Sequence, residues 1–349
     1  MTDATAVSGP RTSLIQKALW QSRVLITIAI VFTAAAYAIA KLYDAPFQSG
    51  TISHLGLAAT VLGPAFMLFM VVHRFFYMAL FIRPKSPTRQ FIADVRTYCL
   101  DPDRLITAAV TFLATMTIVG SFVFLKDFIP VIHPFSWDPA FAAWDKALHG
   151  GQHAYELTLP LLATPLATTI LNAAYHFWFF LLFFVVYLVC LDKDNPVRRN
   201  TFLISFALTW IIGGSVLATV FSSVGPVYYS AFGYGDDYEP LLALLRANNE
   251  VLPVWALGVH DMLLNGYLTG EGSKGISAMP SMHVTTAVLL AFYGFAWRRW
   301  AGWLLVIFAI MIQLGSVHLA WHYAIDGYFG AVIAAGCWFG AKWLAHRFS

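Results

Sequence analysis

Long apolar runs separated by shorter polar segments dominate this sequence. A helix needs about 20 predominantly apolar residues to cross a bilayer. Runs close to or above that length lie near residues 24–42, 55–82, 105–125, 165–191, 201–222, 282–297, 301–317 and 323–345. The pattern predicts an all-α integral membrane protein with about eight transmembrane helices. We divide it into an N-terminal part at 1–104, with a tail, two helices and a cytoplasmic loop, and a six-helix core at 105–349.

The composition agrees with this class of protein. Hydrophobic residues make up 59% of the 349 residues and charged residues 11%, and the mean hydropathy is +0.68. A soluble domain usually carries about 25% charged residues, so this chain suits a lipid environment. No basic run with interleaved aromatic residues occurs, which argues against a nucleic-acid partner. The cysteines are scattered and lack the spacing of a metal or redox site: Cys99, Cys190 and Cys337.

The distribution of Lys and Arg predicts the orientation in the membrane. Cytoplasmic loops carry an excess of these residues. With a cytoplasmic N-terminus and eight spans, 16 of the 21 basic residues are cytoplasmic, and the other five are Lys41, Lys126, Lys146, Arg246 and Lys274. This split predicts cytoplasmic N- and C-termini. It also assigns the long segments 126–164 and 223–281 to a periplasm or an organelle lumen.

A possible anion site lies at the start of the sixth apolar run, in the stretch Gly275–Val284. Proline is well tolerated in the first turn of a helix, so Pro280 predicts that a helix begins here. The free N–H groups of Ser281 and the next two residues then favour an anion. His283 adds a titratable group at the same place. The predicted orientation assigns this helix start to the non-cytoplasmic side.

A second group of polar residues precedes and enters the last apolar run. His322 and Asp326 are four residues apart, so on a helix the carboxylate can hold one imidazole nitrogen. The other nitrogen is then free to act as a base or a nucleophile. A carboxylate in an apolar helix is costly unless it is paired or functional. Both motifs are expected on the same side of the membrane, where His318, one turn before His322, could also reach the site.

These two motifs resemble signature blocks of the type 2 phosphatidic acid phosphatase superfamily. The stretch 280–283 (Pro-Ser-Met-His) is similar to its second block, and the stretch 322–326 (His-Tyr-Ala-Ile-Asp) is similar to its third. The longer stretch 277–283 is most similar to the inositol-phosphorylceramide synthase-like branch. Most members have an Arg six residues before the His of the third block. Here Ser316 stands in that position. The sphingolipid-synthase relatives also lack this Arg.

The resemblance implies a catalytic triad. His322 would attack phosphorus to form a phosphohistidine, Asp326 would orient His322, and His283 would protonate the leaving group and deprotonate the acceptor. It implies no metal and no cofactor. The candidates for binding the phosphate are Ser281, Lys274, Arg246 and Lys126. His318 and Tyr323 are candidates for supporting contacts around the triad.

Several functions remain open at this point. A lipid phosphotransferase is favoured, with a lipid phosphate or phospholipid as donor, and a lipid phosphate phosphatase, with water as acceptor, would use the same triad. A metal-dependent membrane oxygenase could use His318 and His322 with His283 and Asp326 as ligands. A non-catalytic transporter or scaffold is a third class. The compact size and the absence of a glycosylation sequon favour a bacterial inner membrane.

Overall fold

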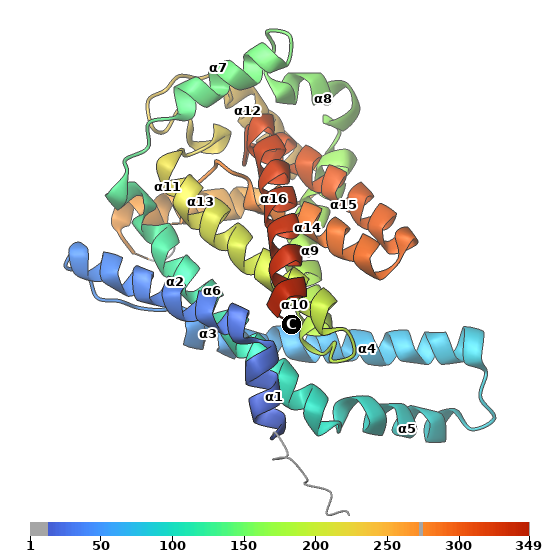
Figure 1. The fold of residues 1–349 in the computed structure, drawn as a ribbon. Coiled ribbons are helices and arrows are strands. Elements are labelled where there is room, and N and C mark those ends of the chain that lie inside the picture. Colours follow the sequence, from blue (N-terminus) through green and yellow to red (C-terminus); the bar gives the residue numbers. More distant parts are fainter. Residues whose placement is uncertain (1–12, 272–274, 349) are drawn as a thin grey trace, which may run out of the picture.

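The computed structural model describes residues 13–271 and 275–348, and within these ranges every regular element is a helix (Figure 1). The described helices that are long and apolar enough to cross a membrane are Arg23–Leu42, Thr51–Ile82, Pro102–Ile132, Pro165–Cys190, Pro196–Val220, Arg299–His318 and Ala324–Phe348. An eighth apolar helix, Met282–Trp297, has 16 residues. These helices correspond to the eight apolar runs of the sequence. The protein is therefore an all-α integral membrane protein, as predicted.

Six of the eight are single uninterrupted helices: α2 (Arg23–Leu42), α6 (Pro102–Ile132), α9 (Pro165–Cys190), α14 (Met282–Trp297), α15 (Arg299–His318) and α16 (Ala324–Phe348). The second span is built from α3 (Thr51–Leu57), η1 (Ala58–Leu62), α4 (Gly63–Tyr77) and η2 (Met78–Ile82). The fifth joins α10 (Pro196–Leu208), η3 (Thr209–Leu217) and α11 (Ala218–Val220). The shorter helices are α1 (Leu14–Gln21), α5 (Pro87–Cys99), α7 (Asp138–Leu148), α8 (Ala154–Leu162), η4 (Pro226–Tyr228), α12 (Glu239–Asn249) and α13 (Trp255–Thr269).

Three of the spans begin with a polar cap followed by proline. The caps accept hydrogen bonds from backbone N–H groups of the first helical turn, and the pairs are Asp101-Pro102 for α6, Thr164-Pro165 for α9 and Asn195-Pro196 for α10. A capping side chain satisfies N–H groups that have no partner inside the helix, and proline has no N–H to satisfy. These pairs therefore determine where α6, α9 and α10 begin.

The helices of the core pack around one another, and the N-terminal helices lie against one side. Helices α14 and α15 form a hairpin, and α16 packs against both α14 and α10. Helix α2 runs along α6, where the hydroxyls of Thr33 and Ser121 are 2.9 Å apart. Helices α4 and α5 extend sideways from this bundle (Figure 1). The division of the chain after residue 104 remains a prediction.

The two ends of the bundle differ in character. One end carries salt bridges between loop and helix ends, among them Lys17–Asp103, Arg104–Asp194, Lys193–Asp101 and Arg198–Asp192. Both described chain ends lie there, since α1 holds Lys17 and the last helix, α16, ends close to it (Figure 1). At the opposite end, α7, α8 and α12 lie over the ends of the long helices (Figure 1). The two motifs found in the sequence lie at this covered end.

Candidate active site

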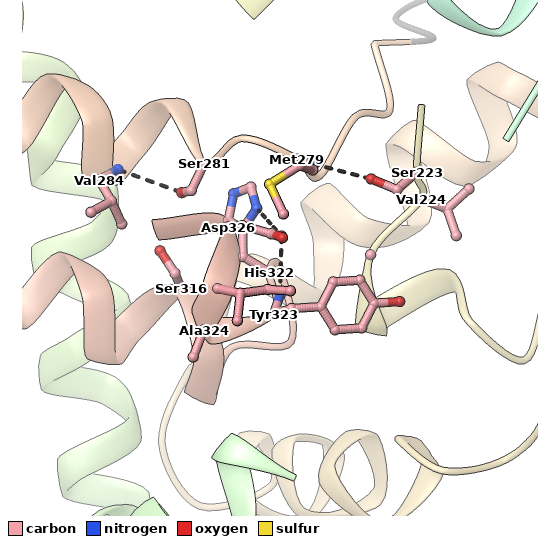
Figure 2. Close-up of polar contacts among 12 residues, drawn as sticks. Ser223, Val224, Met279, Ser281, Val284, Ser316, His322, Tyr323, Ala324 and Asp326 are labelled. Atoms are coloured by element: carbon pink, nitrogen blue, oxygen red, sulfur yellow. Dashed lines mark hydrogen bonds and ion pairs between the residues drawn. The ribbon is translucent and has the colours of Figure 1, made fainter. Parts of the chain in front are cut away.

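His322 and Asp326 form a buried pair at the start of α16. His322 lies in the turn between α15 and α16, where its backbone N–H donates to the Ser316 carbonyl at 3.1 Å. Its Nδ1 lies 3.3 Å from Oδ2 of Asp326, and the same oxygen accepts the backbone N–H of Tyr323 at 3.1 Å (Figure 2). Asp326 is fully buried. The carboxylate therefore contacts the imidazole ring at Nδ1, and Nε2 points away from the carboxylate.

The first turn of α14 lies against this pair. Ser281 caps α14, because its Oγ accepts the backbone N–H of Val284 at 3.5 Å (Figure 2). Its own N–H donates to the backbone carbonyl of Asp326 at 3.1 Å, which ties the two motifs together. The hydroxyl of Ser281 is buried in this capping role, and Ser281 is not among the residues that line the cavity described below.

His283 follows Ser281 and lies beside His322. The centroids of the two imidazole rings are 6.3 Å apart. The His283 ring stacks on Tyr175 at 4.2 Å and lies 4.1 Å from the Trp178 ring, so α9 determines its position. At this separation of the rings, one phosphoryl group between them could contact both. Such contacts are the geometric requirement for proton transfer and nucleophilic attack at one centre.

Both histidines line a cavity of about 440 Å³. Most of its surface is apolar and comes from the membrane helices α6, α9, η3 and α14, for example from Phe122, Phe179, Leu182, Trp210 and Met282. Ligand sites of this kind are largely apolar with a few polar groups that fix orientation. The cavity therefore suits a substrate with a phosphate at the histidines and a hydrocarbon part among the helices.

Lys126, near the end of α6, is the only Lys or Arg among the described residues that line this cavity. Its side chain packs against Gly275, where an added Cβ would lie 3.0 Å from the lysine Cδ. A partly buried ammonium group at this cavity is suited to bind a phosphate.

Burial also sets the protonation state of His322. The loss of solvent lowers the pKa of His322 to about 3, opposed by a hydrogen bond to Ala278 and assisted by the charge of Lys126. Burial disfavours the charged imidazolium because the apolar surroundings solvate it poorly. His322 is therefore neutral at neutral pH and keeps the lone pair that a nucleophile needs.

Two aspartates of α7 support the site, and the sequence analysis did not find them. Asp138 accepts hydrogen bonds from the N–H groups of Val224 and Gly225, both at 2.8 Å, and from the Tyr323 hydroxyl at 2.9 Å. Asp145 accepts the N–H of Ile325 at 3.1 Å, at the start of α16. Burial raises the pKa of both carboxyl groups. Their spacing of seven residues, two helical turns, is the signal that could have placed both on the same face of a helix.

The remaining candidates lie in different places. His318 is buried, with Nε2 2.8 Å from the hydroxyl of Thr168, and it is not among the residues that line the cavity. Arg246 lies on α12 with 64% of its side chain exposed, and its nearest ion-pair partner is Glu239 at 3.7 Å. Lys274 lies outside the described residues. Of the four candidates for phosphate binding, the structure brings Lys126 to the cavity with the histidines and does not bring Arg246 there.

The geometry also bears on the metal-dependent alternative. His318 ends α15, and the chain turns before it reaches His322, so the two rings face different surroundings. Among the described residues, no group of three or more His, Cys, Asp or Glu side chains could hold a metal ion. The oxygenase interpretation therefore finds no support in the arrangement of these side chains.

Comparison with known proteins places the chain in a family. Residues 139–339 match the model of the PAP2 superfamily, and this segment contains His283, His322 and Asp326. The match covers more than half of the chain, so the protein belongs to the PAP2 superfamily, whose members are phosphatases or phosphotransferases. The superfamily expected from the sequence motifs is thus confirmed. No curated protein and no solved structure gives a significant match.

Proposed function

We propose that the protein is a lipid phosphotransferase that works through a phosphohistidine formed on His322. One observation carries the proposal. Nδ1 of His322 lies 3.3 Å from the buried carboxylate of Asp326, and the ring lines the cavity beside His283. A histidine held at one nitrogen presents the other in a defined direction, which is the arrangement a nucleophilic imidazole requires.

In the first step, the Nε2 lone pair of His322 forms a bond to phosphorus. The bond between phosphorus and the leaving oxygen breaks, and protonated His283 gives its proton to that oxygen. The imidazole becomes positively charged, and the carboxylate of Asp326 stabilises this charge. The ammonium of Lys126, at the same cavity, stabilises the negative charge on the phosphoryl oxygens.

The second step reverses the roles. His283 is now neutral and takes the proton of the acceptor hydroxyl, while the acceptor oxygen forms a new bond to phosphorus. The bond between phosphorus and Nε2 breaks, and its electron pair returns to His322. The phosphate or phospho-headgroup has then moved from one lipid to another, and both histidines have regained their starting protonation.

The substrates of this reaction are lipids of the surrounding bilayer. The apolar walls of the cavity support a lipid phosphate or phospholipid as donor. The acceptor is a lipid hydroxyl, or water in the phosphatase alternative. The motif at 277–283 and Ser316 at the position of the usual Arg favour the inositol-phosphorylceramide synthase-like branch. The position of Lys126 at the cavity supports this assignment, because it supplies a cation that does not come from position 316.

The orientation belongs to the same proposal. The excess of Lys and Arg at the end with both chain termini supports a cytoplasmic location for that end. The active site then faces a periplasm or a lumen, and a bacterial inner membrane remains our preferred location. The segment 105–349 acts as the catalytic core, preceded by the N-terminal part at 1–104.

The phosphatase alternative has a specific observation in its favour. The family includes phosphatases, and the proposed triad would accept water in the second step without any change of geometry. The two reactions differ only in which hydroxyl reaches His283. A direct comparison of products is therefore needed.

The deciding experiment uses the full chain purified in detergent. A panel of lipid phosphates and phospholipids serves as donors, with and without an added ceramide or diacylglycerol, and with a chelator present. Free phosphate and new phospholipids are measured in the same samples. A new headgroup-bearing lipid with little free phosphate is expected, and free phosphate alone would identify a phosphatase.

Two variants test the residue assignment. His322→Ala should abolish the product and the acid-labile phosphoprotein that forms with labelled donor. His346→Ala removes an exposed histidine of α16, the helix that follows His322, and should behave like the wild type. Equal turnover by wild type and His322→Ala would contradict the proposed mechanism, and no product from any donor would leave a transporter or scaffold as the better interpretation.

A further inference from the structure

A histidine from the N-terminal helices reaches the cavity. His54 lies on α3 and is among the residues that line the cavity with His283 and His322. Helix α3 belongs to the second span, well before the segment 139–339 that matches the family. The cavity is therefore completed by a side chain that the family segment does not contain.

The position of α3 depends on a close approach to α6. The backbone N–H of Gly50 donates to the carbonyl of Gly120 at 3.1 Å. A Cβ added at Gly120 would lie 2.3 Å from both the backbone nitrogen and the Oγ1 of Thr51. No side chain fits in that space, so glycine lets the backbone of α3 touch α6. This contact holds the first turn of α3, with His54, beside the part of α6 that lines the cavity.

The hydrogen bonding of His54 determines what its ring can recognise. Nδ1 lies 2.7 Å from the carbonyl oxygen of Gly50. A carbonyl oxygen only accepts, so Nδ1 carries the proton, and in the neutral ring Nε2 is then an acceptor. No described residue forms a hydrogen bond with Nε2 of His54. The ring thus offers a lone-pair acceptor in a cavity whose walls are mostly apolar.

From this arrangement we infer that His54 is a substrate-contacting residue that accepts a hydrogen bond from a hydroxyl group of a lipid substrate. The inference rests on the proposed function, since it concerns the same cavity and a lipid in it. The hydroxyl has two possible sources, the acceptor lipid or a polyol headgroup of the donor. A single acceptor nitrogen in apolar surroundings favours a lipid that carries a hydroxyl group over a lipid that presents only hydrocarbon.

The test compares His54→Phe, His54→Gln and wild type in detergent. Phenylalanine keeps an aromatic ring but removes the acceptor, and glutamine keeps a polar acceptor. A neutral hydrogen bond contributes about twofold to tenfold in an equilibrium constant. We expect the KM of the hydroxyl-bearing lipid to rise about twofold to tenfold in His54→Phe, by more than any change in kcat, and less in His54→Gln.

Matched controls separate this effect from a change in α3. Ile52→Ala alters a nearby exposed residue of the same helix and should keep the wild-type KM. Melting temperatures of all variants show whether each protein is folded. If His54→Phe does not fold, His54→Leu, which also removes the acceptor, takes its place in the comparison with Ile52→Ala.

KM measurements with different substrates identify the source of the hydroxyl. A rise confined to the KM of the added acceptor, with phosphatidic acid as donor, assigns the contact to the acceptor hydroxyl. A rise confined to a polyol-headgroup donor assigns it to the donor. Turnover that depends on His322 but shows the wild-type KM for every substrate in His54→Phe would overturn this inference alone, whereas turnover independent of His322 would overturn the proposed function.

Discussion

The Tyr323 hydroxyl donates a 2.9 Å hydrogen bond to the buried carboxylate of Asp138, which lies 185 residues earlier in the chain. The same carboxylate accepts the N–H groups of Val224 and Gly225. One side chain of α7 therefore joins the loop after α11 to the turn that carries His322. The positions of three separate segments around the active site depend on this single group.

Replacing Asp138 by Asn should lower both stability and turnover. The Asn amide nitrogen is a donor and would face at least one N–H group that Asp138 now satisfies. An unsatisfied buried donor costs about 1–3 kcal/mol, so the free energy of unfolding should fall by about that amount and kcat should fall with it. Thermal unfolding and lipid turnover measure the two effects. The exposed Asp236→Asn is the control, and an unchanged melting temperature in Asp138→Asn would argue against the joining role.

Lys126→Met should weaken phosphate binding. The substitution keeps the length and the apolar stem of the side chain but removes the only Lys or Arg among the described cavity residues. A hydrogen bond to a charged group contributes about 1.5–3 kcal/mol, which corresponds to a loss of about tenfold to a hundredfold in kcat/KM. Lys126→Arg should retain part of the activity. Lys146→Met on α7 is the matched control, and a kcat/KM as low as that of Lys126→Met would show that loss of positive charge in general is responsible.

Gly225→Ala should disturb the active site through the backbone. Gly225 has φ 86° and ψ 170°, a region that only glycine adopts readily. An added Cβ would also lie 2.6 Å from the Trp321 carbonyl oxygen, next to His322. Gly233 has φ 77° but no atom within 4 Å of the corresponding Cβ, so Gly233→Ala carries only the conformational cost. We expect Gly225→Ala to lose activity and about 1–3 kcal/mol of stability, and Gly233→Ala to keep its activity. Equal activity of the two variants would contradict the importance of the contact with Trp321.

Acidification should destabilise the folded protein through His322. Burial lowers the pKa of His322 from 6.5 to about 3, so the unfolded chain binds more protons than the folded protein between these values. The contribution to stability is complete above about pH 6.5 and is lost as the pH falls toward 3. At about pH 5.5 the loss is about 1.4 kcal/mol relative to alkaline pH. Thermal unfolding of wild type and His322→Leu at about pH 5.5 and at alkaline pH should show a smaller loss of stability in the variant. His346→Leu should follow the wild type, and identical pH dependence in His322→Leu would contradict the assignment.

The apolar helices and the two motifs could be predicted from the sequence because both are local properties. A run of apolar residues indicates a span whatever its neighbours are, and the runs near 165–191 and 282–297 agree with α9 and α14 to within a residue. The spacing of His322 and Asp326 likewise brings their side chains together across a single turn of the chain. His318 shows the limit of such reasoning. Helical periodicity put it on the same stripe as His322, but α15 ends at His318 and Ala320 adopts φ 61°, so the periodicity does not continue to His322.

The sequence by itself determined the membrane class, the helices and the pair of motifs that identify the superfamily. It favoured Lys274 as the phosphate-binding cation over Arg246 and Lys126, and it did not reveal Asp138 or His54. Only the tertiary structure decided that Lys126 and His54 line one cavity and that Asp138 contacts Tyr323. The physical reason is that these contacts join helices far apart in the chain, and their geometry depends on the packing of whole helices, which no local pattern of residues contains.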